Sequence, residues 1–140
     1  MHAIRFDPEK DLPPIPFSEQ ICRLASDLKN LGLNWQPHVG CFVWDPDGFI
    51  KSESPFPERI YFILSLPRFI EIFGSVEIMV EKLVWLPTWH QARMLYQRLG
   101  VTDDGLANES RFWTAFSPGE DLQQIYLRIG NALQKRETKV

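Results

Sequence analysis

Apolar residues recur with the helical period in the first clear element of the chain. Ser18 is suited to the N-cap, Glu19 favours the first turn, and Gly32 suits the left-handed residue that ends a helix. Between them the apolar positions lie three or four residues apart, as one face of a helix requires. These positions are Ile21, Leu24, Ala25, Leu28 and Leu31.

The pattern then changes to short apolar runs that are typical of strands. Asp45-Pro46-Asp47-Gly48 is a strong turn signal, because proline presets the backbone and glycine tolerates positive φ. It predicts a hairpin with strands near 40–45 and 48–52. A third strand is expected over Ile60–Leu64 and, being almost uniformly apolar, is expected to be central. Leu83–Leu86 predicts a fourth strand.

Helical patterns dominate the rest of the chain. Pro67–Phe73 and Val76–Leu83 predict two short helices, separated by Gly74-Ser75, with Ser75 capping the second. A further helix is expected to open at Thr88 and to end at Gly100. Thr88 with Gln91 three residues later forms a capping-box pattern.

The last third of the chain is also predicted to be helical. Ala107–Phe116 predicts a short aromatic helix that carries Trp113. The final helix is expected to start after Ser117, with Pro118 in its first turn and Glu120 completing a capping box. Its apolar face extends to Leu133.

This order of elements predicts a single α+β domain over residues 1–140. We expect a small, mostly antiparallel sheet of about four strands packed against several helices. Residues 1–17 form a proline-rich, extended lead-in, because each proline disfavours helix at the residue before it. Residues 136–140 are expected to be a frayed tail.

Charge and composition narrow the classes of partner. The net charge of the 140-residue chain is −3 and its basic residues are scattered among acidic ones, whereas a nucleic-acid binder usually carries a basic patch. We therefore expect no nucleic-acid partner. No apolar stretch approaches the ~20 residues of a membrane span, so no membrane partner is expected.

Two cysteines and the N-terminal sequence bear on the compartment. Cys22 and Cys41 both have apolar neighbours, which suits buried thiols. The start of the chain lacks the charged and then apolar pattern of a signal peptide. We therefore expect a cytoplasmic protein with reduced thiols. A disulfide between the two cysteines is the alternative.

Metal and cofactor signals are weak. His38 and Cys41 have a His-x-x-Cys spacing without a second pair, whereas structural zinc takes four ligands in closely spaced pairs. Asp45 and Asp47 could hold a divalent ion beside a phosphate, but a turn in which they bind local amides explains them more simply. No glycine-rich phosphate loop is present. We assign no metal site and no cofactor.

The junction from Leu83 to Arg93 is the sharpest candidate for ligand binding. A strand that runs into a helix N-terminus exposes unpaired amides and the positive end of the helix dipole. We expect Thr88, Trp89, His90 and Arg93 around this point, with the carboxylates of Asp45 and Asp47 completing a pocket. In the alternative interpretation Thr88 only caps the helix, Trp89 packs on the sheet, and His90 and Arg93 share a solvated face.

Aromatic residues are numerous, with five Trp, ten Phe and three Tyr. Aromatics beyond the needs of the core can form a contact surface. Trp44, Phe56 and Trp113 are the candidate interface residues. Phe56 stands between two prolines, which can hold it in a fixed, exposed pose, although it can equally fold back onto the core.

Two classes of function remain. The first is a non-catalytic binding or protein-interaction domain, with a protein partner or self-association, for example as a homodimer. The alternative is a small enzyme or ligand-binding domain with its pocket near Thr88. The sequence carries no recognisable catalytic signature, such as a nucleophile elbow, which favours the first class.

Overall fold

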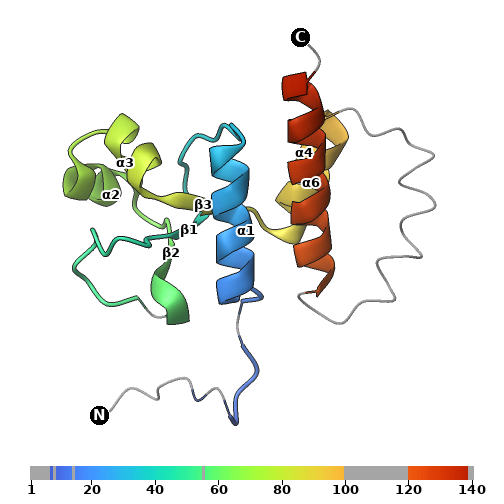
Figure 1. Ribbon diagram of the computed structural model, residues 1–140. Coiled ribbons are helices and arrows are strands. Elements are labelled where there is room, and N and C mark those ends of the chain that lie inside the picture. Colours follow the sequence, from blue (N-terminus) through green and yellow to red (C-terminus); the bar gives the residue numbers. More distant parts are fainter. Residues whose placement is uncertain (1–6, 8, 14, 55, 100–119, 139–140) are drawn as a thin grey trace.

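The computed structural model describes residues 7, 9–13, 15–54, 56–99 and 120–138 (Figure 1). Its elements are α1 (Glu19–Asn30), β1 (Phe42–Trp44), the 3-10 turn η1 (Pro57–Arg59), β2 (Ile60–Phe62), α2 (Leu66–Phe73), α3 (Val76–Lys82), β3 (Val84–Leu86), α4 (Trp89–Arg98) and α6 (Glu120–Thr138). The predicted single α+β domain is confirmed. The expected helix over 107–116, Trp113 and the Ser117 cap lie outside the described residues.

The described strands form one antiparallel sheet in the order β2-β1-β3. Phe42 pairs with Phe62 on one side and with Leu86 on the other, and Trp44 pairs with Ile60 and Val84. The predicted return strand over 48–52 is wrong, because that segment is not a strand and β2 pairs with β1 instead. The segment that begins at Ile60 is also not central, since β1 occupies the middle of the sheet.

Strand alternation divides the core into two clusters. Successive side chains of a strand point to opposite faces, so Ile60, Val84 and Leu86 enter one cluster. Val43 and Tyr61 enter the other. A sheet of three short strands is therefore buried on both faces, and each face needs its own cover of helices.

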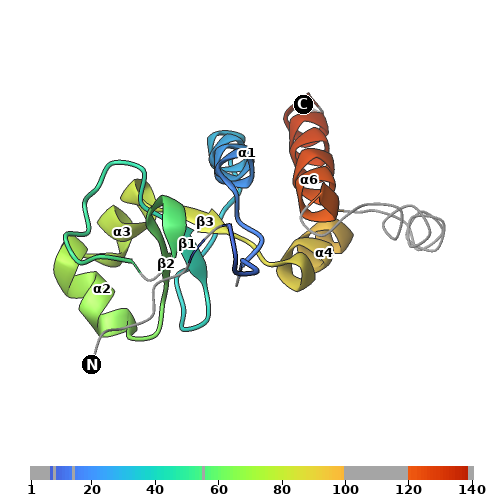
Figure 2. The same ribbon diagram turned by 90° about the horizontal axis from the view of Figure 1, so that it is seen from below.

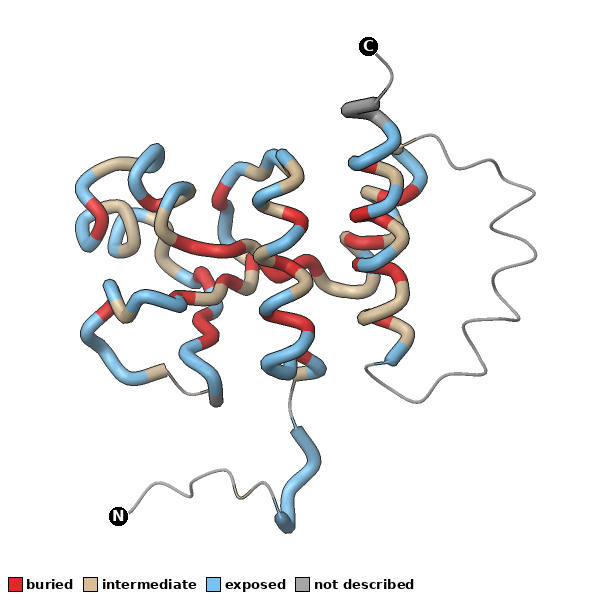
Figure 3. Tube along the Cα trace, in the orientation of Figure 1, coloured by how far each residue is buried: buried red, intermediate tan, exposed pale blue. Residues whose placement is uncertain are grey.

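The helices cover the two faces as two separate groups. α2 and α3 pack against each other and contribute Phe73 and Met79 to the cluster around Val43. On the other side α1 packs on β3, α6 packs on α1, and α4 packs on α6. Figure 2 shows α1 between the sheet and α6, with α4 beside α6. Buried positions in Figure 3 run through the strands and along one side of α1 and α6.

Local capping fixes where three helices begin, as predicted. Ser18 accepts a hydrogen bond from the Ile21 amide, and Ser75 accepts one from the Ile78 amide. Thr88 forms the complete capping box with Gln91. Each cap satisfies amides that the first helical turn leaves without an intrahelical partner.

The two ends of the described chain differ in how they join the domain. Within the lead-in, Phe17 is buried and Ile15 packs beside it. Both belong to the α1 cluster, which is the core cluster that contains the buried face of α1 together with Ile60, Val84 and Leu86. At the other end α6 continues to Thr138, so the helix enters the segment predicted as a frayed tail. Val140 lies outside the described residues. No helix in the described part of the chain combines the length and apolar character that crossing a membrane would need.

A buried tyrosine ties α6 to the connection between β3 and α4. Tyr126 is almost fully buried, and its hydroxyl donates a hydrogen bond to the carbonyl of Pro87, which is also buried. Burial raises the pKa of the Tyr126 hydroxyl well above its ordinary value, and the nearby Cys22 adds to the shift. Burial likewise raises the pKa of the Cys22 thiol to about 12.

We predict that Tyr126→Phe lowers the free energy of unfolding by about 1–2 kcal/mol, because it leaves a buried carbonyl without its donor. The matched control is Tyr61→Phe. The Tyr61 hydroxyl donates to the carbonyl of Ser52 (2.6 Å), an exposed residue, so water can replace the lost donor. Urea unfolding at pH 7 measures both variants. Equal losses in the two would contradict the assigned role of Tyr126.

Cys22 and Tyr126 also determine how the stability of the protein changes at alkaline pH. Cys22 and Tyr126 have raised pKa values in the folded state, so above the unfolded values of 9.0 and 10.0 the folded chain keeps protons that the unfolded chain releases. Stability therefore falls as the pH rises above about 9. In Tyr126→Phe, the free energy of unfolding should therefore decrease less steeply with pH above about pH 10.

Candidate functional site

Asp45 organises the turn that follows β1. The residue is fully buried, and its carboxylate accepts hydrogen bonds from the amides of Phe49 (3.0 Å) and Ile50 (2.8 Å). These bonds satisfy the charge locally and direct Ile50 into the core instead of along a return strand. The structure thus agrees with the simpler interpretation of Asp45, as a turn residue. Asp47 is exposed.

Arg59 closes this turn from the side of β2. Glu58 and Arg59 both have positive φ (63° and 62°), a conformation that non-glycine residues rarely adopt. The Asp45 amide donates to the Arg59 carbonyl (3.1 Å), and the Arg59 guanidinium lies 3.7 Å from the Asp45 carboxylate. The strained backbone therefore brings a cation to the only charge that is buried among the described residues.

The start of α4 carries the complete capping box that the sequence predicts. Thr88 Oγ1 accepts from the Gln91 amide (3.2 Å), and Gln91 Oε1 accepts from the Thr88 amide (2.9 Å). The Arg93 guanidinium lies over the Trp89 ring, 5.5 Å from its centroid. Trp89 packs against the α1 cluster and His90 is exposed. The cap and the packed indole agree with the alternative interpretation of this junction, but Arg93 is half-buried and does not share a solvated face with His90.

The strand register separates the two halves of the expected pocket. Trp44 pairs with Val84, so Asp45 lies at the end of β1 that faces the start of β3. Thr88 follows the other end of β3, roughly 13 Å of extended chain beyond Val84. The carboxylates of Asp45 and Asp47 therefore do not converge with Thr88, Trp89, His90 and Arg93.

Two of the three candidate interface residues are half-buried. Trp44 and Phe56 both pack against the α1 cluster. Phe56 also lies beside Phe42, with ring centroids 5.9 Å apart, and Phe42 contacts Phe17 (5.2 Å) and Phe62 (5.0 Å) in the same way. This aromatic cluster holds Phe56 against the sheet rather than in an exposed pose. Trp113 lies outside the described residues.

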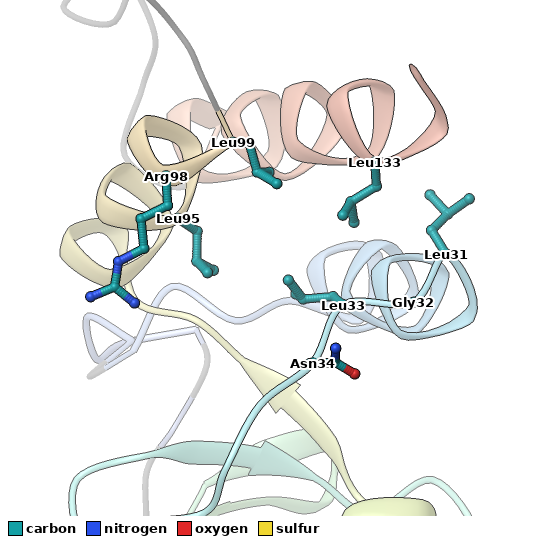
Figure 4. Close-up of a pocket in the computed structure, with 8 residues that line it drawn as sticks. All are labelled: Leu31, Gly32, Leu33, Asn34, Leu95, Arg98, Leu99 and Leu133. Carbon is teal, nitrogen blue, oxygen red and sulfur yellow. The ribbon is translucent and has the colours of Figure 1, made fainter. Parts of the chain in front are cut away.

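A groove that the sequence analysis did not predict lies between α4 and the segment that follows α1. It consists of two hollows of about 460 Å³ and about 630 Å³. They share three lining residues, Asn34, Leu95 and Arg98, and so form one continuous surface feature. Figure 4 shows the first hollow, in which Leu33, Leu95, Leu99 and Leu133 point into the space between α4, α6 and this segment.

The second hollow has aromatic and polar walls. Trp35 and Trp85 stack there, with ring centroids 6.2 Å apart and an angle of 12° between the planes. Their indole Nε1 atoms are buried and have no hydrogen-bond partner in the described part of the chain. The remaining lining residues are Asn34, Gln36, His38, Leu95 and Arg98. A buried hydrogen-bond donor without an acceptor lowers the stability of a protein, and most buried donors have a partner. Two such donors beside one hollow are therefore unusual.

Sequence reasoning missed the groove because its residues come from four separate segments: the connection after α1, β3, α4 and α6. Asn34, Trp35, Gln36 and His38 lie in the connection between α1 and β1, whereas Arg98 lies at the end of α4. The one available signal was Trp35, a large aromatic residue in a short polar connection. The candidate site predicted from the sequence lies instead at the start of α4, where Thr88 is nearly three helical turns away from Arg98.

Metal and thiol chemistry find little support at these positions. No group of three or more His, Cys, Asp or Glu residues is close enough to share a metal ion within the described ranges. Cys41 and Cys22 are free thiols and both are buried. Burial raises the pKa of the Cys41 thiol, as predicted from its apolar neighbours, which keeps it protonated. His38 Nδ1 donates to its neighbour's carbonyl, that of Val39 (2.9 Å).

Comparison of the chain with protein-family models, with curated proteins and with solved structures finds no match in any of the three.

We predict that Gly48→Ala destabilises the protein more than Gly74→Ala does. Both glycines have positive φ (71° and 90°), so each alanine costs about 1–2 kcal/mol in backbone strain. A Cβ at Gly48 would also lie 2.7 Å from Arg59 Nη2, whereas a Cβ at Gly74 meets nothing within 4 Å. Moving Arg59 away weakens its pairing with buried Asp45. Chemical denaturation of the two variants measures the difference, and equal losses would show that Arg59 moves aside freely.

Proposed function

We propose that this protein is a non-catalytic binding domain that holds its ligand in the groove between α4 and the connection from α1 to β1. The observation that carries the proposal is the continuity of the two hollows through Asn34, Leu95 and Arg98. Each hollow falls within the ~300–1,000 Å³ range of small-molecule sites. An apolar wall with a few convergent polar groups is the usual composition of such sites.

The placement of the other candidates also favours binding over catalysis. The carboxylates of Asp45 and Asp47 lie at the opposite end of the β1–β3 pair from Thr88. Asp45 is engaged by two amides and Arg59, so its charge serves the fold. The described lining of the groove consists mainly of leucines, indoles and amides, together with His38 and Arg98, and it contains no carboxylate, serine, threonine or cysteine beside the imidazole.

The open edge of β2 supports self-association as a second candidate function. Hydrogen bonds join residue 45 to 59 and residue 41 to 63, so by antiparallel alternation the backbone groups of Phe62 face away from β1. The Phe62 side chain is 38% exposed and that of Leu64 is 75% exposed. Residues 60–64 carry no charge, although charged residues are a usual protection of edge strands.

We predict that a fragment library of small neutral and charged compounds produces chemical-shift changes that cluster on the groove. The test uses ¹⁵N-labelled protein, with the indole signals assigned through Trp35→Phe and Trp85→Phe. Asn34→Phe fills the shared part of the groove with a larger side chain and should reduce the shifts at least several-fold. Asn30→Phe is the matched control, because Asn30 is exposed at the end of α1 and does not line either hollow. Shifts that cluster elsewhere, or that survive in Asn34→Phe, would exclude the groove as the site.

For the second candidate we predict that Leu64→Lys shifts the protein toward monomer, since it places a charge beside the edge of β2. Sedimentation velocity over a range of protein concentrations measures the change. Leu12→Lys is the control, because Leu12 is 91% exposed and lies outside the sheet. A parent protein that stays monomeric at the highest concentration would reject self-association through this edge.

A further inference from the structure

The described lining of the groove carries a positive charge and no negative charge. Among the described residues that line the two hollows, Arg98 is the only one with a permanent charge, and none is a carboxylate. Arg98 is exposed on α4, and its guanidinium forms no ion pair with any described residue. In a chain with a net charge of −3, this leaves a single cation at the point where the two hollows meet. Charge complementarity therefore favours a ligand with one negative charge.

Apolar and polar linings lie at opposite ends of the groove. The hollow of about 460 Å³ contains five leucines, which come from the end of α1 and its following connection, from α4 and from α6: Leu31, Leu33, Leu95, Leu99 and Leu133. The neighbouring hollow contains the indoles of Trp35 and Trp85 and the side chains of Gln36 and His38. In Figure 4 the leucines converge on one space while Arg98 lies to one side of it. A ligand that fits both ends is amphiphilic.

Arg98 supplies the accessible hydrogen-bond donors of the polar end, because it is exposed and lines both hollows. The Trp35 and Trp85 Nε1 atoms are buried, so the indoles offer a ligand their ring surfaces and not these donors. The guanidinium of Arg98 presents donors in a fork that matches the two oxygens of a carboxylate. An ionised carboxylate is acceptor-only, so it complements this lining better than a hydroxyl or an amide, which bring further donors.

We infer that the groove binds a free aliphatic carboxylate, with its head group at Arg98 and its hydrocarbon chain along the leucines. This inference rests on the proposed function, because it names the ligand class for the same groove. The two hollows have the dimensions of a small-molecule site, whereas a folded protein partner buries about 800 Å² per side. One cation suits a monoanion, whereas a phosphate dianion would favour additional positive charge.

The experiment titrates the protein with hexanoate, octanoate and decanoate below their micelle concentrations, and with 1-octanol as the neutral match. Binding is followed through the amide and indole signals of groove residues. We expect the affinity to rise about two- to fourfold for each added methylene, because each buries apolar surface. Octanoate should bind more tightly than 1-octanol, and the difference should decrease as salt is added.

Arg98→Gln should weaken octanoate binding about five- to tenfold and leave 1-octanol binding unchanged. Arg68→Gln is the matched control, since Arg68 is exposed on α2 and does not line the groove. Both substitutions replace an exposed helical arginine, so folding is expected to survive, and thermal unfolding checks this. Arg98→Lys should restore part of the affinity by keeping the charge.

The outcomes separate this inference from the proposed function. If neutral fragments bind in the groove but octanoate and decanoate do not, the carboxylate inference falls and the binding function stands. If no compound binds there, both fall. Equal octanoate affinity in Arg98→Gln and Arg68→Gln would also overturn the inference, as would binding to phospholipid vesicles without binding to the soluble carboxylates.

Discussion

The whole arrangement depends on burying both faces of a sheet that is only three strands wide. Each strand has three residues, so adjacent positions must serve opposite cores. Val43, at the centre of β1, faces one cluster, while its neighbours Phe42 and Trp44 pack on the other. A sheet this small has little surface of its own, and most of the apolar burial is supplied by the helices on either side.

This constraint also explains why the groove exists. The near face of the sheet is covered mainly by α1, and the α4–α6 pair packs on α1 rather than directly on the strands. α4 follows the sheet after the short connection at Pro87, which Tyr126 holds from α6. The end of α4 and the connection after α1 therefore approach each other without interlocking. The space between them is the groove that Leu33, Leu95 and Arg98 line.

The sequence was most informative where structure is determined locally. Ser18, Ser75 and Thr88 were recognisable caps, because a cap depends on residues within one turn, and all three helices begin where predicted. The return strand at 48–52 was mispredicted although the turn itself was recognised. The Asp45 carboxylate binds the amides of Phe49 and Ile50, so those amides are not available for a ladder with β1. Pairing with β2, fifteen or more residues further on, could not be inferred from turn chemistry.

Two arginines on α4 show why local reasoning looked for a site at the start of the helix, whereas the proposed groove lies at its end. Arg93 lies near the helix N-terminus, where sequence rules look for anion sites, but its guanidinium stacks on Trp89 and its Nε atom is buried. Arg98 lies five residues later, in the last turn of α4, where the helix dipole favours a cation. Five residues on a helix correspond to about 140° of rotation, so the two side chains leave α4 in different directions. Only the packing of α4 against α6 decides which of them meets the connection after α1, and that packing is a tertiary property. The charge that a ligand would meet is therefore set by the rotation of α4 about its axis, which the buried side chains of Ala92 and Tyr96 fix.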